Sequence, residues 1–287
     1  MQRRTVSRET GHLRGLGLFS GAECAINIRP SPAATGILFA PPGRGPVAVH
    51  ISRCVDWKPA GWPDGLGVRN TAIGMGPWAV GTTEHLLSAL AGLGITDVVI
   101  DVEGPEVPIL DGSALPFVAA LRDLVMDTEK KVEPIRLRNA IQITDGSGGE
   151  VTAKPREDGC LFSYALDYGE GSPIPPQTAY WTGDAEEYAR DIAPARTFSL
   201  RAEAEAARAA GLFKKFTPSE MLVIGDDGAP IDNAWRLSNE PARHKLLDLI
   251  GDLALLARPL HAEVTASKSG HALVRELCRQ VLKQQSL

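Results

Sequence analysis

The chain has 287 residues, a length that suits one large or two modest domains, each able to bury its own core. Hydrophobic residues make up 44% and charged residues 23%, which is ordinary for a globular protein. The formal net charge of −5 argues against a general nucleic-acid-binding protein, because such proteins carry a basic surface. No nucleic-acid partner is therefore expected.

Neither the N-terminal segment nor the cysteines indicate secretion. The first residues are basic but lack the apolar run of a signal peptide, and no stretch approaches the roughly 18 apolar residues of a transmembrane helix. The cysteines form no CxxC pair, so neither a disulfide framework nor a thiolate zinc site is expected. The sequence predicts a cytoplasmic protein without a transmembrane segment, and we expect a monomer.

The first part of the chain reads as strands followed by a pair of helices. Apolar and polar residues alternate between turns rich in Gly and Pro, and helical patterning begins only after residue 80. The expected elements are strands at 25–29 and 47–51, a helix from 83 that Gly92 and Gly94 stop, a strand at 97–102, and a helix over 117–121 that runs to about Met126.

A polar segment at residues 127–134, DTEKKVEP, ends in proline and is predicted to be a linker. After it the plan of strands and a helix pair is repeated. The expected elements are strands at 140–144 and 161–167, helices at 201–210 and 241–256, a strand near 261–266 and a helix at 270–284. The prediction is an α+β fold with two similar domains, residues 1–127 and residues 134–287.

The sharpest chemical signal is His244 followed by Asp248. Residues four apart on a helix share one face, with Cβ atoms about 5–6 Å apart, so both side chains can point at one metal ion. Taken alone, the pattern is more typical of a surface His–Asp pair, because one His and one Asp make only half a metal site.

A second signal is Glu84 beside His85 at the start of a predicted helix. It resembles half of the HExxH pattern, in which one residue ligates zinc and another acts as base, but no second His follows four residues later. With His244 and Asp248, His85 completes the three protein ligands of a catalytic zinc with an open position. Glu84 is then a carboxylate able to take a proton from water.

Two more residues extend this group. His271 follows Ser269 and Gly270 in the first turn of the last predicted helix, where it can donate to a leaving amine or an oxyanion, although this segment alone favours a capping or surface histidine equally. Asp252 lies four residues beyond Asp248 and can orient a further histidine.

Segments spread over nearly the whole chain resemble the UDP-3-O-acyl-N-acetylglucosamine deacetylase family, zinc enzymes of lipid A synthesis. The matching segments, in family order, are GLGLFSG near the start, NTAIG at 70–74, TTEHLLSALAGLGI at 82–95, PEVPILDGSALPFV at 105–118, APARTFSL at 193–200, RHKLLDLIGDLALL at 243–256 and TASKSGHAL at 265–273. The resemblance implies two α+β domains, each a mainly antiparallel sheet layered on a pair of helices, with the active site between them.

The resemblance also implies catalytic roles. The matching residues are the Zn²⁺ ligands His85, His244 and Asp248, the general base Glu84, the catalytic His271 with its orienting carboxylate Asp252, and Thr197, which helps to hold the oxyanion. Zinc would lower the pKa of a water and polarise the acetamide carbonyl, while the base removes the proton of the water. The products would be acetate and a free 2-amino sugar nucleotide.

The substrate implied by the family is an acylated UDP-sugar. Lys245 matches a lysine on the phosphate side of the substrate and is expected to serve both binding and catalysis, and Leu18 is expected to contact substrate. An insert at about 196–237 supplies an apolar groove for the acyl chain in this family. The candidate lining residues are Phe198, Leu200, Leu212 and Phe213, for each of which ordinary core packing is the alternative.

Two departures from the family pattern leave the substrate open. Phe19 stands where His is common, and the family segment Gly-Gly-Ser-Leu-Asp-Asn is replaced near residues 211–220, with Ser219 and Glu220 in place of Asp-Asn. Three hypotheses therefore stand: the family reaction, a paralogue that deacetylates another N-acetylated sugar or amide, and a non-catalytic protein that binds a sugar nucleotide or zinc. Retention of Glu84 argues against the third, since a binding protein needs no general base.

Overall fold

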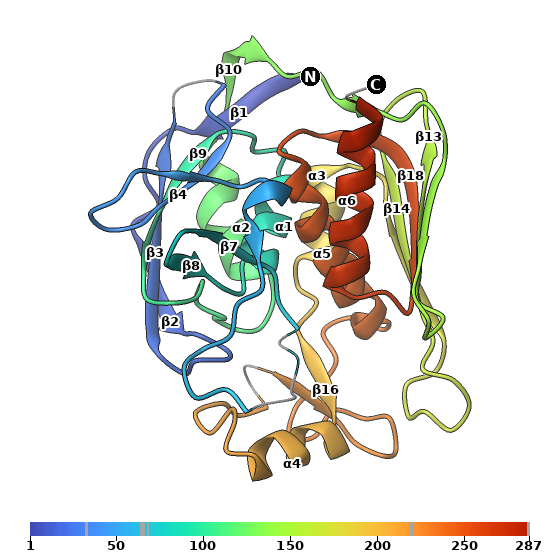
Figure 1. Ribbon diagram of the computed structural model, residues 1–287. Helices are drawn as coiled ribbons and strands as arrows, with labels where there is room; N and C mark the ends of the chain where they lie inside the picture. Colours follow the sequence, from blue (N-terminus) through green and yellow to red (C-terminus); the bar gives the residue numbers. More distant parts are fainter. Residues whose placement is uncertain (32–33, 64–66, 68, 219–220, 286–287) are drawn as a thin grey trace.

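The computed structural model describes residues 1–31, 34–63, 67, 69–218 and 221–285. Two sheets form the outer layers of the molecule, and the main helices lie between them (Figure 1). Among the described residues, no helix combines the length and apolar character needed to cross a membrane.

The sheet of the first half has five strands, with one parallel pair, β4–β9, among antiparallel neighbours. In spatial order the strands are β2 (His12–Leu16), β3 (Glu23–Pro30), β9 (Val98–Glu103), β4 (Ile37–Ala40) and β5 (Val47–Ala48). The strand expected at 47–51 is thus shorter than predicted, because a 3₁₀ turn begins at Ile51. A small second sheet joins β6 (Cys54–Val55), β7 (Ala72–Met75) and β8 (Trp78–Val80).

The sheet of the second half repeats the same order and orientations. Its strands are β12 (Ile141–Thr144), β13 (Glu150–Pro155), β18 (Leu260–Ser267), β14 (Leu161–Leu166) and β15 (Gln177–Trp181), with β11 (Ile135–Arg136) also paired to β18. The parallel pair β14–β18 stands where β4–β9 stands in the first sheet. The predicted α+β fold with two similar halves is therefore confirmed, and the repeat is visible in topology.

The segment expected to be a linker is a strand as far as Lys131. Strand β10 (Val125–Lys131) pairs antiparallel with β1 (Gln2–Val6), from Val6 opposite Val125 to Gln2 opposite Lys131. Its side chains are mostly exposed, so backbone pairing rather than apolar patterning forms it. The preceding helix is correspondingly shorter than predicted and ends at Leu121, followed by one 3₁₀ turn. The domain limits drawn at this segment stay a prediction.

The helices between the sheets carry the polar residues singled out in the sequence. They are α1 (Glu84–Gly92), α2 (Leu115–Leu121), α5 (Glu240–Leu253) and α6 (His271–Gln285) (Figure 1). Nearly every residue of α1 and α5 is buried, because the two helices pack against each other, α1 also packs against α2, and α5 also packs against α6 and strands β14 and β15. Charged groups on these helices are therefore removed from water, which is where large pKa shifts arise.

Helices α1 and α5 approach so closely that only a glycine fits at one point of contact. A Cβ atom on Gly251 would lie 2.1 Å from the carbonyl oxygen of Glu84. This contact fixes the first turn of α1 against the last turn of α5. The two helices thereby bring residues that lie far apart in the sequence to the same place.

We expect Gly251→Ala to lower the free energy of unfolding by about 1–3 kcal/mol or more, because the added methyl group must push the two helices apart. Denaturant unfolding measures the loss. Gly146→Ala is the matched control, since a Cβ at Gly146 meets no atom within 4 Å. Equal stability of the two variants would show that the helices do not need this close approach.

Candidate metal centre

Three metal-binding side chains converge where α1 meets α5. His85 is the second residue of α1, and His244 and Asp248 lie one turn apart on α5. The Nε2 atoms of His85 and His244 lie 3.6 and 3.5 Å from Oδ1 of Asp248. One ligand atom from each residue lies within 4.8 Å of the others, and all three residues are buried. The predicted surface-pair alternative for His244 and Asp248 is thus wrong.

The donor spacing fits a small tetrahedral cation. Zinc bonds of about 2.0–2.2 Å at tetrahedral angles place neighbouring donor atoms about 3.3–3.6 Å apart, and the two distances from Asp248 Oδ1 lie in that range. Two imidazoles and one carboxylate are also a donor set that zinc prefers. The residues therefore fit a zinc ion.

The protonation states suit the same ion. Burial lowers the pKa of His244 to about 3, so its ring is neutral at physiological pH. The carbonyl oxygen of Ala195 lies 3.1 Å from His244 Nδ1, so a proton on that atom leaves the Nε2 lone pair facing the cluster. Burial opposes ionisation of Asp248, but Lys245 and the neighbouring histidines together outweigh burial and hold the pKa of Asp248 well below its usual range.

Glu84 lies beside the metal donors as the first residue of α1, and only 3% of its surface is exposed. Its Oε2 atom accepts a hydrogen bond from the backbone amide of Thr71 at 3.0 Å. Burial raises the pKa of Glu84 above its ordinary value, and positive charge on His271 or His85 would oppose that rise. A carboxylate with raised proton affinity next to a cation site is suited to accept a proton from water.

His271 and the buried Asp252 form a second pair, mostly removed from water, with Nδ1 and Oδ2 2.7 Å apart. Burial disfavours the imidazolium, but the carboxylate of Asp252 outweighs burial and raises the pKa of His271 to about 9. His271 is therefore protonated at neutral pH and its Nε2 atom is free to donate a second proton. The local sequence favoured a surface histidine equally, and this pair excludes that reading.

Lys245 lies beside the metal donors, and Thr197 lies two residues after Ala195 in the chain. The Nζ atom of Lys245 lies 2.8 Å from the second carboxylate oxygen of Asp248, an ion pair that raises the pKa of Lys245. The amide of Thr197 donates to the Gly112 carbonyl at 2.7 Å, which ties its backbone to the first half. Thr197 is half-buried, and its role at an oxyanion stays a prediction.

An ion pair that the sequence did not reveal braces this region. The guanidinium of Arg196 lies 2.8 Å from the carboxylate of Glu240, and both side chains are almost fully buried. Glu240 is the first residue of α5, so the pair joins the start of that helix to the backbone at Ala195, which contacts His244. No local pattern marks it, because the two residues are 44 positions apart.

The insert region lies at one end of the molecule, below the helices in Figure 1. Strand β16 (Phe198–Leu200), helix α4 (Arg201–Ala209) and strand β17 (Leu222–Ile224) form it, and the two strands pair in parallel. Phe198 and Leu200 pack against the main core, and the ring of Phe198 lies 6.1 Å from that of His244. A cavity of about 400 Å³ lies within the insert, and Phe213 is the one proposed groove residue among those that line it.

The two departures from the family pattern meet in space. Leu18, Ile109 and Phe216 form a small core of their own, with Phe19 and Phe213 packed against it. The rings of Phe19 and Phe213 lie 5.9 Å apart, edge to face. Ser219 and Glu220, which also depart from the pattern, lie outside the described residues.

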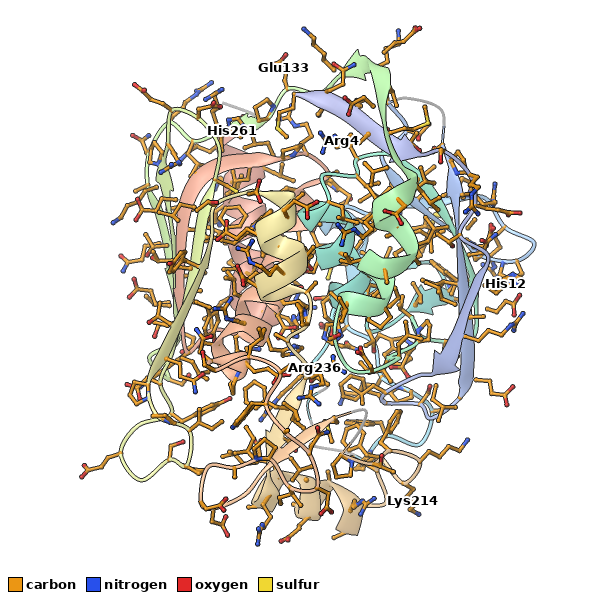
Figure 2. The ribbon with its side chains drawn as sticks, turned by 180° about the vertical axis from the view of Figure 1, so that it is seen from behind. Arg4, His12, Glu133, Lys214, Arg236 and His261 are labelled. Atoms are coloured by element: carbon orange, nitrogen blue, oxygen red, sulfur yellow. The ribbon has the colours of Figure 1, made fainter. Side chains whose placement is uncertain are left out.

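Further contacts join the insert side to the first half. Arg236, near the centre of Figure 2, lies 2.8 Å from Asp111 through its guanidinium. Lys215 donates to the carbonyl of Gly21 at 2.9 Å. The Lys215 contact thus holds the loop that carries Leu18 against the insert, and the Arg236 contact holds the segment at Asp111.

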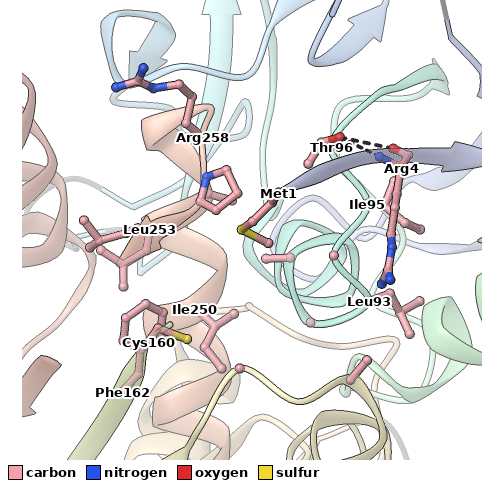
Figure 3. A pocket seen from close by; sticks show the side chains of 18 of the residues that line it. Met1, Arg4, Leu93, Ile95, Thr96, Cys160, Phe162, Ile250, Leu253 and Arg258 are labelled. Carbon is pink, nitrogen blue, oxygen red and sulfur yellow. Dashed lines mark hydrogen bonds between the residues drawn. The ribbon is translucent and has the colours of Figure 1, made fainter. Parts of the chain in front are cut away.

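A larger cavity lies at the other end of helices α1 and α5 and holds none of the metal donors. Its volume is about 660 Å³, and Leu93, Cys160, Ile250 and Leu253 line it (Figure 3). It opens at the C-terminal end of α1, whereas Glu84 lies at the N-terminal end. The clustered metal donors, and not the volume of a cavity, indicate where the chemistry of this protein takes place.

Comparisons with known proteins show the family of this chain. Residues 3–283 match the family described as UDP-3-O-acyl N-acetylglycosamine deacetylase. Three proteins named UDP-3-O-acyl-N-acetylglucosamine deacetylase are similar to the chain. The one from Leptospira biflexa is 34% identical over 99% of this chain and 91% of its own. Those from Acidithiobacillus ferrooxidans and Myxococcus xanthus are 37% and 33% identical, over 94% and 99% of this chain and 87% of each relative. The chain therefore belongs to the UDP-3-O-acyl N-acetylglycosamine deacetylase family.

Proposed function

We propose that this chain is a zinc-dependent N-deacetylase that hydrolyses the acetamide of UDP-3-O-acyl-N-acetylglucosamine, in lipid A biosynthesis. One observation carries the proposal: three buried residues able to hold a metal converge beside a buried carboxylate, Glu84, and a histidine, His271, that is paired with the buried Asp252. The relatives named above carry this substrate in their names, which supports the substrate class.

The residues of the chain divide the reaction between them. Zinc, when held by His85, His244 and Asp248, supplies a Lewis acid that lowers the pKa of water and polarises the acetamide carbonyl. Glu84 accepts the proton of the attacking water. His271 offers positive charge to the developing oxyanion or gives its proton to the leaving nitrogen as the C–N bond breaks. Acetate and the free amino sugar leave.

Substrate contacts are proposed for the residues around this centre. Lys245 would face the phosphate side of the UDP-sugar, Thr197 would help to hold the oxyanion, and Leu18, Phe198 and Leu200 would contact the substrate. The half-buried position of Phe198 beside the ring of His244 supports this for Phe198. The expected monomeric state, the cytoplasmic location and the absence of a nucleic-acid partner stay predictions.

Acetate release from the acylated and the unacylated UDP-N-acetylglucosamine, measured on the same zinc-loaded preparation, tests the proposed substrate. We expect turnover of the acylated form to exceed that of the unacylated form. Equal rates, or a preference for the unacylated form, would favour the paralogue hypothesis. Zinc binding without acetate release from either would favour the non-catalytic one.

Asp252→Asn is expected to move the alkaline limb of the pH–rate profile to lower pH. The carboxylate of Asp252 raises the pKa of His271 to about 9 in the metal-free chain, and a bound cation nearby lowers that value. Activity that needs protonated His271 is lost as the pH rises through this pKa. Removal of the Asp252 charge lowers the pKa, so the loss occurs at lower pH. Profiles of kcat/KM for both proteins measure the limb, and an unmoved limb would separate His271 from the chemistry.

A further inference from the structure

Thr71 hydrogen-bonds to both of the carboxylates that the proposed reaction uses. Its backbone amide donates to Glu84 Oε2 at 3.0 Å, and its hydroxyl donates to Asp252 Oδ1 at 2.5 Å. Thr71 is fully buried, as are both carboxylates. One residue of the first half thus touches the start of α1 and, across the interface between the halves, helix α5.

The backbone of Thr71 is itself held in place. Its carbonyl oxygen accepts hydrogen bonds from both the amide and the hydroxyl of Thr83, each at 3.0 Å. Thr83 is the residue before α1, so the segment that carries Thr71 and the first turn of α1 form one hydrogen-bonded unit. Movement of Thr71 would therefore move Glu84 as well.

The hydroxyl group of Thr71 can donate one hydrogen bond, and only one of the two nearby polar atoms is available to accept it. His271 Nδ1 lies 3.4 Å from the hydroxyl oxygen, but that nitrogen already pairs with Asp252 Oδ2 at 2.7 Å. The hydroxyl therefore donates to Oδ1, and Asp252 receives one donor on each oxygen. With one oxygen fixed by Thr71, the other is held toward His271.

We propose that Thr71 is a positioning residue that holds Asp252, and through it His271, in a fixed position relative to Glu84. The inference rests on the proposed roles of Glu84 and His271. Thr71 does not act on the substrate. It acts through the two carboxylates, as partners in the outer shell of a metal site commonly do.

Three variants test the hydroxyl. Thr71→Val keeps the shape of the side chain but leaves Asp252 Oδ1 buried without this donor, so we expect kcat to fall about 10- to 100-fold with little change in KM. Thr71→Ser restores the donor and is expected to recover most of kcat. Thr5→Val is the matched control, because it also removes a buried threonine hydroxyl, one whose partner is the Ser31 amide, and its kcat should stay within about twofold of the parent.

A double-mutant cycle separates positioning from a general loss of stability. If Thr71 acts through Asp252, Thr71→Val should lower kcat much less in the Asp252→Asn background than in the parent. A second readout is the ¹⁵N NMR signal of the His271 imidazole in metal-free protein, which should shift in Thr71→Val and return in Thr71→Ser.

The outcomes are distinct. If the parent turns over substrate, two results would overturn the inference. One is that the fold losses in kcat of Thr71→Val and Asp252→Asn multiply in the double variant, and the other is that Thr71→Ser fails to recover kcat. A parent without acetate release would overturn the proposed function instead. An unshifted His271 signal in Thr71→Val would overturn the inference without reference to activity.

Discussion

Replacement of Glu84 by glutamine is expected to reduce acetate release about 100- to 10,000-fold, the range typical of a lost general base. Glutamine has nearly the same shape, and its carbonyl oxygen can still accept the amide of Thr71 as Glu84 does. It cannot accept a proton from water at neutral pH. The loss should therefore appear in kcat, with zinc content and fold unchanged.

Glu84→Gln needs a control that changes charge without touching the site. Glu103→Gln serves, because Glu103 is an exposed residue at the end of β9 that pairs with Arg14. Its turnover should match the parent. Metal analysis and circular dichroism on each protein separate a catalytic loss from a folding loss. A Glu84→Gln variant within about tenfold of the parent would remove Glu84 from the role of base.

Asp248→Asn is expected to weaken zinc binding by more than about 100-fold, since loss of outer-shell partners alone already costs about 10- to 100-fold. The change removes the negative charge that both imidazoles face at 3.5 and 3.6 Å. It also removes the ion pair with Lys245. Turnover should fall in proportion to bound zinc.

Zinc affinity measured by competition with a chelator tests this result. Asp127→Asn is the control, because Asp127 is an exposed carboxylate paired with Arg4 and lies on β10. Recovery of Asp248→Asn turnover at high zinc would agree with lost affinity. Unchanged zinc affinity in Asp248→Asn would place the metal elsewhere.

Much of the fold follows from local pattern. The helix that carries His244 and Asp248 was visible in the sequence, because Leu246, Leu247 and Ile250 mark its buried face, and it forms over Glu240–Leu253. The central strands β9 and β18 likewise come from apolar runs in the sequence. Strand β10 did not, since it is polar and forms by backbone pairing to β1.

The site was less visible locally. Helical spacing predicted that His244 and Asp248 share a face, but not that His85, 159 positions earlier in the sequence numbering, would meet them. That meeting depends on Gly251, which lets α1 approach α5. Thr71 was within a recognised segment, yet its contacts with two carboxylates depend on the tertiary fold alone.

The contact between the two departures from the family pattern was also not predictable from the sequence. Phe19 and the segment around Phe213 were separate departures from the family pattern in the sequence. In the structure their rings are in contact, with Trp62 packed edge to face against both, at 5.3 and 6.2 Å. The two departures therefore belong to one aromatic cluster, although they are far apart in the sequence.

A zinc titration of metal-free protein, with acetate release followed at each step, is the most direct test of the proposed zinc-dependent hydrolysis. We expect the parent to be inactive without metal, and its turnover to rise with zinc and saturate at one ion per chain. Asp248→Asn should fail to saturate over the same range, and Glu84→Gln should bind one zinc without turnover. Acetate release by the metal-free parent, or equal zinc binding by Asp248→Asn and the parent, would contradict the proposal.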